Sequence, residues 1–306
     1  MSHHSLFKSK IIDLSIYLFT YPFILLFSIL PFEVSVGFGW LVGTVASLIF
    51  PFRRNILSEN LRRAFGKYIT KREINRIQKR VWQNTCLALF EFIKLPYLSK
   101  KKIISLVASI ENEKYWDEVV AKGGFITVTG HLGNWEFMGA YFSARGVKMD
   151  VLVKALHNNY FDQFVNKRRI KLGYPPIYIH EGIKKILTSL KMGRVVVFVA
   201  DQDARNKGIF VNFFGVPAST FVGPAFFHLR TGAPILPVFD VRVGLTKHKI
   251  IIAPPIAAPD ELNEDNKILF IMQKYNDILE RIIREYPDQY FWFHRRWKTQ
   301  PKSKKE

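Results

Sequence analysis

The sequence predicts an α/β fold, in which a mostly parallel sheet is flanked by helices, with an N-terminal hydrophobic helical membrane anchor. Two observations support this prediction. From residue 125 onward, short apolar runs rich in β-branched residues alternate with stretches of helical spacing, the pattern of a parallel sheet covered on both faces. The first fifty residues are almost uncharged and hold two long apolar runs. We therefore divide the chain into an anchor, residues 1–52, and a second domain, residues 53–306.

The first apolar run covers residues 11–32, which is long enough for the roughly 20 residues of a spanning helix. Its one charge, Asp13, lies near its start, and Pro22 lies in its middle. A cleaved signal peptide and a buried helix of a soluble protein are the rival interpretations. The run is long for a signal peptide and no small-x-small cleavage site follows it, so a membrane segment is favoured.

The second apolar run, residues 34–52, is uncharged and contains Gly39-x-x-x-Gly43. Its length is borderline for a span, so we expect it either to pack against the first helix through its small residues or to lie in the membrane interface. A basic cluster follows at once and favours contact with anionic headgroups on the cytoplasmic side over a merely solvated helix face. The cluster consists of Arg53, Arg54, Arg62 and Arg63.

Two helices, over residues 59–65 and 73–95, are predicted next, and Pro96 ends the second. The chain has one cysteine, Cys86, which excludes an internal disulfide; its apolar neighbours predict a buried structural thiol. A basic linker (100–102) and a short helix (115–121) follow. Strands are then predicted over residues 125–129, 150–154, 177–179, 195–200, 235–239 and 249–252. Helices are predicted over residues 135–143, 161–172, 182–191, 222–230 and 266–284, before a basic tail from Lys298.

The composition restricts the partners. A formal net charge of +20 predicts an anionic partner: nucleic acid, anionic lipid or an acidic protein. The apolar first fifty residues argue against a free nucleic-acid binder. The sequence has no Gly-x-Gly-x-x-Gly, phosphate-binding loop, Gly-x-Ser-x-Gly elbow, or His and Cys spacing of a zinc site. We therefore expect no cofactor and no metal.

The chemistry is predicted at the stretch from Phe125 to Ala140. A short strand there is broken by Gly130, so His131 lies in a tight turn at the strand's carboxyl end and Glu136 in the first turn of the next helix. The same spacing separates His157 from Asp162, so spacing alone is not specific; a turn histidine and an exposed acid would give it too.

The structural context favours the pair formed by His131 and Glu136. Such a pair suits acyl transfer, in which a neutral imidazole takes a proton from an attacking hydroxyl and a carboxylate fixes the tautomer. The oxyanion then needs a donor, for which Lys154 and a backbone N–H beside the turn are candidates.

Further candidate substrate contacts surround this pair. Asn134 lies beside it in the sequence. Asp201, Gln202 and Arg205 follow the most apolar strand, and Arg205 with Lys207 has the charge to bind phosphate, although a solvated loop is an equal alternative. Phe213 and Phe214 could line an acyl-chain groove, although an aromatic pair is more often plain core.

Together these residues resemble a known family. The run Gly130-His-Leu-Gly-Asn-Trp-Glu136 resembles the signature of the bacterial lipid A late acyltransferases, whose His-x4-Asp/Glu core is shared with glycerolipid acyltransferases. Further segments that fit are 60–65, 201–203, 213–217, 223–224, 230–237 and 289–297, so the resemblance covers nearly the whole chain. One departure is Lys154, where the family usually has arginine; lysine keeps the charge but loses the bidentate fork.

The resemblance implies a membrane-anchored O-acyltransferase on the cytoplasmic face of the bacterial inner membrane. Acyl carrier protein or coenzyme A thioesters are the implied donors, and a phosphorylated, already acylated glucosamine disaccharide is the implied acceptor. His131 would be the general base and Glu136 its partner, with no acyl-enzyme. Two alternatives stay open: the same chemistry on another glycolipid or a lysophospholipid, and a non-catalytic basic protein that binds membrane or nucleic acid.

Overall fold

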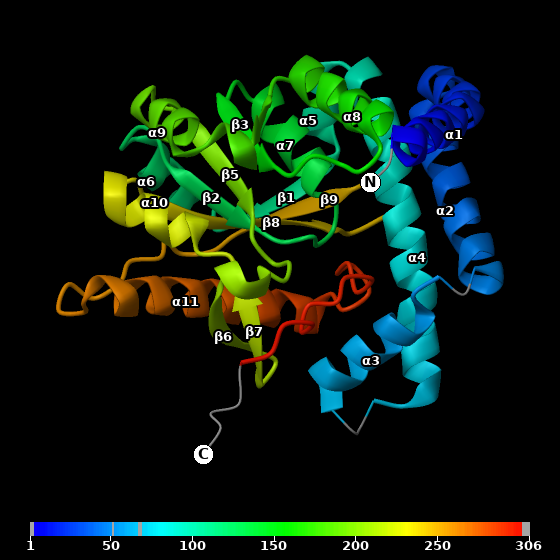
Figure 1. The fold of residues 1–306 in the computed structure, drawn as a ribbon. Helices are drawn as coiled ribbons and strands as arrows, with labels where there is room; N and C mark the ends of the chain where they lie inside the picture. The colour runs from blue at the N-terminus through cyan, green and yellow to red at the C-terminus, as the bar shows by residue number, and fades with distance from the viewer. Residues whose placement is uncertain (1–2, 51, 67–68, 302–306) are drawn as a thin grey trace.

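A computed structural model describes residues 3–50, 52–66 and 69–301. Its centre is a seven-stranded sheet with the strand order β1-β9-β8-β2-β5-β3-β4 (Figure 1). The strands are β1 (Val107–Glu111), β2 (Ile126–Thr129), β3 (Met149–Val153), β4 (Pro176–Tyr178), β5 (Val195–Val199), β8 (Ile235–Arg242) and β9 (His248–Ile252). A separate hairpin joins β6 (Ile209–Phe213) to β7 (Val216–Thr220).

Helices cover both faces of the sheet. The α-helices are α1 (His3–Ile29), α2 (Phe32–Ile49), α3 (Arg54–Phe65), α4 (Lys71–Lys94), α5 (Lys100–Ser105), α6 (Lys114–Val120), α7 (Trp135–Ala144), α8 (Asn159–Leu172), α9 (Ile183–Lys191), α10 (Gly223–Thr231) and α11 (Glu264–Glu285). Helices α5, α6 and α7 share one apolar core with one face, and α9, α10 and α11 share another core with the opposite face. The predicted α/β class is thereby confirmed.

Most of the sheet is parallel. Strands β8, β2, β5, β3 and β4 run in one direction, β9 is antiparallel to β8, and β1 runs parallel to β9. Six strands lie where the sequence predicts them, within a few residues. Three further strands lie outside the predicted ones: β1, whose side chains show no clear alternation of burial, and the β6–β7 hairpin. The basic run predicted as a linker begins helix α5.

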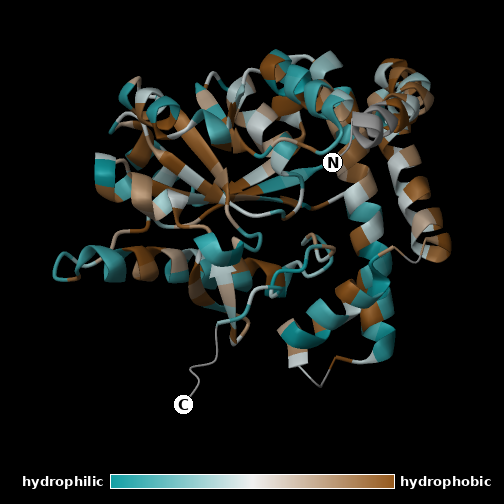
Figure 2. Ribbon diagram, in the orientation of Figure 1, coloured by the Kyte–Doolittle hydropathy of each residue, from teal (hydrophilic) through white to brown (hydrophobic). Residues whose placement is uncertain are grey.

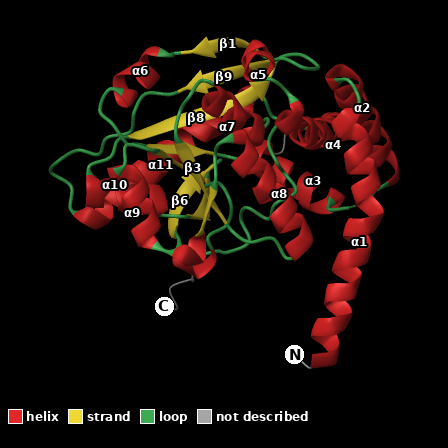
Figure 3. Cartoon of the chain, turned by 90° about the horizontal axis from the view of Figure 1, so that it is seen from above, coloured by secondary structure: helices red, strands yellow, loops and turns green. Residues whose placement is uncertain are grey.

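Both N-terminal helices carry apolar residues on their surfaces. By length and composition, residues 11–29 of α1 and all of α2 suffice to cross a membrane. In Figure 2 these helices form the largely brown side of the molecule. Helix α1 projects away from the rest of the chain toward its N-terminus (Figure 3). It packs near its C-terminal end, where Ile24 and Phe27 lie against α4 and α8.

The small residues of α2 contact α4. A Cβ on Gly43 would lie 2.6 Å from the Cα of Gln83, and one on Gly39 would lie 3.0 Å from the Cβ of Phe90. The expectation that this motif packs against the first helix is therefore wrong. The reason is that α4 runs antiparallel to α2 along this face, so that Gly39 lies beside Phe90 and Gly43 beside Gln83.

Helix α4 lies between the apolar helix α2 and the helices that cover the sheet. Thr70 and Glu73 form a capping box at its start, and its C-terminal half is buried between α2 and α7. The predicted burial of Cys86 is confirmed, and burial raises the pKa of its thiol to about 11. The buried end of α4 also brings a carboxylate, Glu91, into the interior beside the candidate site.

Candidate active site

His131 is held by the carboxylate of Asp201. Its Nδ1 lies 2.7 Å from Oδ1 of Asp201, and its backbone N–H donates to Oδ2 at 2.9 Å. Since an ionised carboxylate only accepts, Nδ1 carries the proton, and in the neutral ring Nε2 is the nitrogen without one. Burial alone would raise the pKa of Asp201, but the charge and hydrogen bonds of His131 outweigh it and hold that pKa at about 2. The side chain of His131 is 20% exposed and that of Asp201 is 2% exposed.

Strand register explains this contact. Strand β2 pairs in parallel with β5, and Thr129 stands opposite Val199. His131 and Asp201 each follow two residues later, at the carboxyl edge where ligands collect in such sheets. The strands therefore place an imidazole and a carboxylate side by side although they lie 70 residues apart in the chain.

Glu136 does not contact His131. It lies in the first turn of α7 as predicted, but its carboxylate accepts from Nε of Arg169 at 3.1 Å and from the hydroxyl of Tyr174 at 3.1 Å. It also forms an ion pair with the guanidinium of Arg169. The expectation that Glu136 orients the imidazole is thus corrected: helix α7 turns this side chain toward α8, and Asp201 stands at the ring.

Asn134 is a buried cap. Its side chain accepts from the N–H of Phe137 and donates to Glu91 at 2.7 Å, while its backbone N–H donates to Asp240 at 2.8 Å. At 2% exposure it does not offer the substrate contact expected of it. Its polar groups instead fix the start of α7 directly after the turn that carries His131.

Behind this cap lies a buried network of two acids and two bases: Glu91, Asp240, Arg242 and His248. Arg242 donates to Glu91 at 2.7 Å; His248 reaches Asp240 through Nδ1 at 3.0 Å and Glu91 through Nε2 at 3.2 Å. The four formal charges cancel, which lets the group stay ionised away from water. The arrangement ties α4, β8 and β9 to the turn that carries His131.

The network makes stability depend on pH. Burial alone would lower the pKa of His248, but Asp240 and Glu91 raise it from 6.5 to about 9. A raised folded-state pKa contributes stability that is complete below pH 6.5 and is lost as the pH rises through about 9. We expect the thermal midpoint to fall across this window and the fall to flatten in His248→Gln. An equal pH slope in both proteins would contradict this assignment.

The other candidates from the sequence lie around the same edge. The amide Nε2 of Gln202 is 3.3 Å from Nε2 of His131, the ring nitrogen that does not contact Asp201. Lys154 follows β3 and is exposed. Arg205 is exposed in a short 3-10 turn, with a φ of 55°. Within the described residues, neither Lys154 nor Arg205 hydrogen-bonds to His131.

Phe213 and Phe214 are core residues. They are 0% and 6% exposed, so the expectation that they line an acyl-chain groove is wrong for this structure. The β6–β7 turn is pinned to α11, because the N–H of Phe214 donates to Glu280 at 2.6 Å. The rings of Phe214, Phe65 and Trp292 pack against one another.

A C-terminal segment, residues 289–297, completes the site, and the sequence analysis assigned it no functional role. The N–H of Phe291 donates to the carbonyl of His131 at 2.9 Å, and Leu132 bridges Tyr290. Two side chains hold the segment: Arg53 donates to the carbonyl of Phe293, and Asn60 donates to the carbonyls of Trp292 and His294. The sequence feature that could have indicated this role is the density of aromatic and basic residues directly after α11.

His294 is a second imidazole near the first. Burial lowers the pKa of His294 to about 4. The nearby Asp201 raises this pKa and His131 lowers it, and burial has the largest effect, so the ring is neutral at physiological pH. Its Nδ1 is buried and has no hydrogen-bond partner among the described residues. An unpaired buried N–H donor is rarer than an unpaired acceptor, which favours the proton on Nε2.

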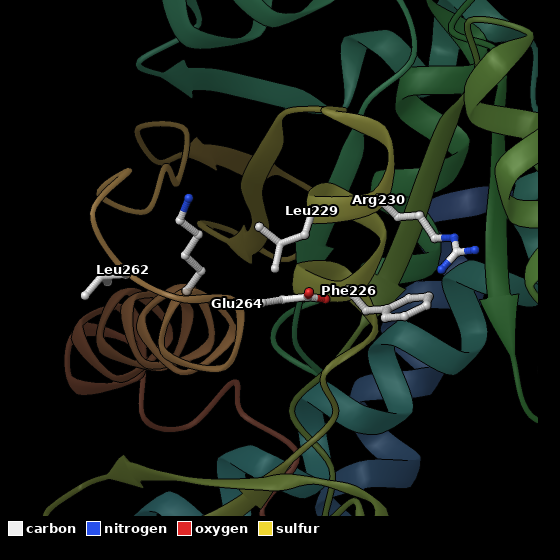
Figure 4. Close-up of a pocket in the computed structure, with 6 residues that line it drawn as sticks. Phe226, Leu229, Arg230, Leu262 and Glu264 are labelled. Carbon is white, nitrogen blue, oxygen red and sulfur yellow. The ribbon is translucent and has the colours of Figure 1, made fainter.

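Elsewhere, a cavity of about 390 Å³ lies between α10 and α11, lined by Phe226, Leu229, Arg230, Leu262, Glu264 and Lys267 (Figure 4). It does not include His131 or any other residue predicted for the site. Among the described residues, no group of three or more His, Cys, Asp or Glu side chains is arranged to hold a metal ion.

The fold is that of an α/β protein with a His131–Asp201 pair at the carboxyl edge of its sheet. The model of the bacterial lipid A biosynthesis acyltransferase family matches residues 5–299. The chain therefore belongs to that family and is an acyltransferase.

Individual relatives include enzymes named for two different acceptors. The lipid A biosynthesis lauroyltransferase of Escherichia coli is 24% identical over 275 residues, which cover 89% of this chain and 88% of that protein. A phosphatidylinositol mannoside acyltransferase of Mycobacterium tuberculosis is 29% identical over 154 residues, 48% of each chain. Among solved structures, the 1-acyl-sn-glycerophosphate acyltransferase PlsC of Thermotoga maritima is similar, with 14% identity, a TM-score of 0.37, and coverage of 79% of this chain and 97% of that one.

Proposed function

We propose that this enzyme moves a fatty acyl chain from an acyl thioester to a hydroxyl of a lipid A precursor. The observation that carries the chemistry is the buried Asp201 carboxylate on Nδ1 of His131, which leaves Nε2 as an unprotonated base on the accessible side of the ring. The match of the lipid A family over residues 5–299 supports the acceptor class.

The reaction follows from this geometry. Nε2 of His131 takes the proton of the acceptor hydroxyl as the oxygen attacks the thioester carbonyl. Asp201 stabilises the resulting imidazolium. When the tetrahedral intermediate collapses, the carbon–sulfur bond breaks and the imidazolium returns its proton to the leaving thiolate. No acyl-enzyme forms. Glu136 acts indirectly, by holding Arg169 against α7.

His294 supplies the hydrogen bond to the oxyanion in this scheme. A neutral Nε2–H donor next to the base stabilises developing negative charge without competing for the proton. Lys154 and a backbone N–H of the turn are the other candidate donors.

We expect His294→Ala to lower kcat by about 10²–10³-fold, the usual effect of removing one oxyanion donor, with little change in KM. His294→Gln, which keeps an N–H donor, should recover part of the rate. Steady-state kinetics of both variants checks this. A change confined to KM, or a glutamine variant no better than alanine, would exclude the oxyanion role.

The donor and the location follow from charge and from the apolar helices. Acyl carrier proteins are acidic and a net charge of +20 suits them, while coenzyme A thioesters are the alternative donor. We propose that residues 1–52 anchor the chain in the bacterial inner membrane and that residues 53–306 act on its cytoplasmic face. The exposed apolar residues of α1 and α2 support the anchor.

The acceptor is tested by mass spectrometry. Detergent-solubilised protein is incubated with acyl carrier protein thioester and the tetra-acylated lipid A precursor, and separately with a phosphatidylinositol mannoside and a lysophospholipid. One added acyl mass on the lipid A precursor alone supports the proposal. Added mass only on the mannoside would favour the second candidate, which the similarity to the mycobacterial enzyme raises.

A further inference from the structure

A second cavity lies between α3 and the C-terminal segment. It has a volume of about 290 Å³, and its polar and charged lining is Glu59, Asn60, Arg63, Arg295 and Lys298. We call it the basic pocket. With three cations and one carboxylate it has a formal charge of +2. A concave site of this charge fits a compact anion.

The cations in the basic pocket differ in their freedom. Arg63 is held in place, since its guanidinium pairs with Glu59 at 2.9 Å and lies 5.7 Å from the Trp297 ring centroid. Arg295 and Lys298 are exposed, and neither side chain takes part in a hydrogen bond or ion pair within the described residues. Two cations are thus free to meet a ligand beside one that is already oriented.

The basic pocket shares its scaffold with the catalytic turn. Asn60, in its wall, donates to the carbonyls of Trp292 and His294 at 2.8 and 2.7 Å. The same segment donates from Phe291 to the carbonyl of His131. These hydrogen bonds connect the wall of the pocket to His131, so a ligand group in the pocket would be held at a fixed position relative to that imidazole.

The basic pocket also lies at the rim of the apolar surface. Phe50 and Phe52 are 55% and 56% exposed at the end of α2, and the pocket begins at Ile56, two residues into α3. An acyl chain on the apolar side would place its headgroup at this level. An acidic carrier protein would need basic residues spread over a wide, open surface. A cavity of about 290 Å³ is too small for such a contact.

We propose that the basic pocket binds a phosphate group on the headgroup of the lipid acceptor. This inference rests on the proposed function, since it names the part of the acceptor that the enzyme reads. Arg295 supplies a planar guanidinium that can bind two phosphate oxygens at once, and Lys298 adds charge.

The test compares two acceptors that differ only in phosphate. Full-length protein in detergent is given one acyl donor with the phosphorylated acceptor or its phosphatase-treated form. Arg295→Gln is expected to raise KM for the phosphorylated acceptor about 10-fold or more, with kcat and the KM of the dephosphorylated acceptor unchanged. Arg230→Gln, which removes a charge from the cavity between α10 and α11, is the matched control and should change neither.

Three outcomes would overturn the inference. Equal effects of Arg295→Gln on both acceptors would show that the pocket does not read phosphate. A rise in KM for the acyl carrier protein donor alone would assign the pocket to the carrier protein. Competition by inorganic phosphate without a preference for the phosphorylated acceptor would leave only a free-anion site. If the wild type transfers no acyl group, the proposed function fails. Co-flotation with phosphorylated lipid still tests the pocket, because the wild type should bind that lipid more strongly than Arg295→Gln does.

Discussion

His131→Ala is expected to lower kcat for acyl transfer by about 10⁴-fold, the upper range for a positioned general base. The thermal midpoint should stay near the wild-type value, because the ring is partly exposed at the edge of the sheet and its removal leaves Asp201 with the backbone N–H of residue 131. Product mass over time, with acyl thioester and lipid acceptor, measures the rate. A variant that retains most of the rate would remove His131 from the mechanism.

The partner of His131 is decided by a matched pair of variants. Asp201→Asn should lower kcat by about 10³–10⁴-fold, because asparagine no longer holds Nδ1 protonated and Nε2 free. Glu136→Gln should cost less and leave the hydrogen bond on Nδ1 intact, since Glu136 contacts Arg169 and Tyr174. Proton NMR of histidine-labelled protein follows the Nδ1 proton in each. Loss of that resonance in Glu136→Gln but not in Asp201→Asn would reverse the assignment.

The sequence was sufficient to place both partners at the sheet edge but not to pair them. The glycine break located His131 after one strand, and the most apolar run located Asp201 after another. Their contact depends on β2 lying next to β5, a neighbour relation that skips two intervening strands. Glu136 was the plausible partner because it is close in the sequence, yet side-chain direction on the first turn of α7 is set by packing against α8.

The remaining errors share a physical cause. Asn134, Phe213 and Phe214 were assigned to substrate because polar and aromatic residues near a turn suit that role. The fold uses Asn134 to satisfy the N-terminus of α7 and the two phenylalanines to fill the core. The capping bond of Asn134 to Phe137 is local, but its burial against Glu91 depends on a long-range neighbour, as does the burial of the two phenylalanines against the C-terminal segment. The spacing of residues along the chain does not reveal such neighbours.

Glu91→Ala is expected to lower the free energy of unfolding by about 3–5 kcal/mol, the usual cost of removing one member of a buried ion pair. Burial alone would raise the pKa of Glu91, but the charges of Arg242 and His248 lower it well below its usual range, so the native residue is an anion. Its loss leaves two buried cations facing only Asp240. Thermal melts below pH 6.5, where His248 is charged in both states, measure the loss.

A double variant separates charge from packing in this network. Glu91→Leu together with Arg242→Leu removes one charge of each sign, so it should be less destabilising than Glu91→Ala although it changes more atoms. Because Glu91 also accepts from Asn134, which caps α7 after the catalytic turn, the single variant should lower kcat as well. A single variant as stable and as active as wild type would show that the turn holds His131 without support from α4. Helix α4 and the turn that carries His131 would then be mechanically independent.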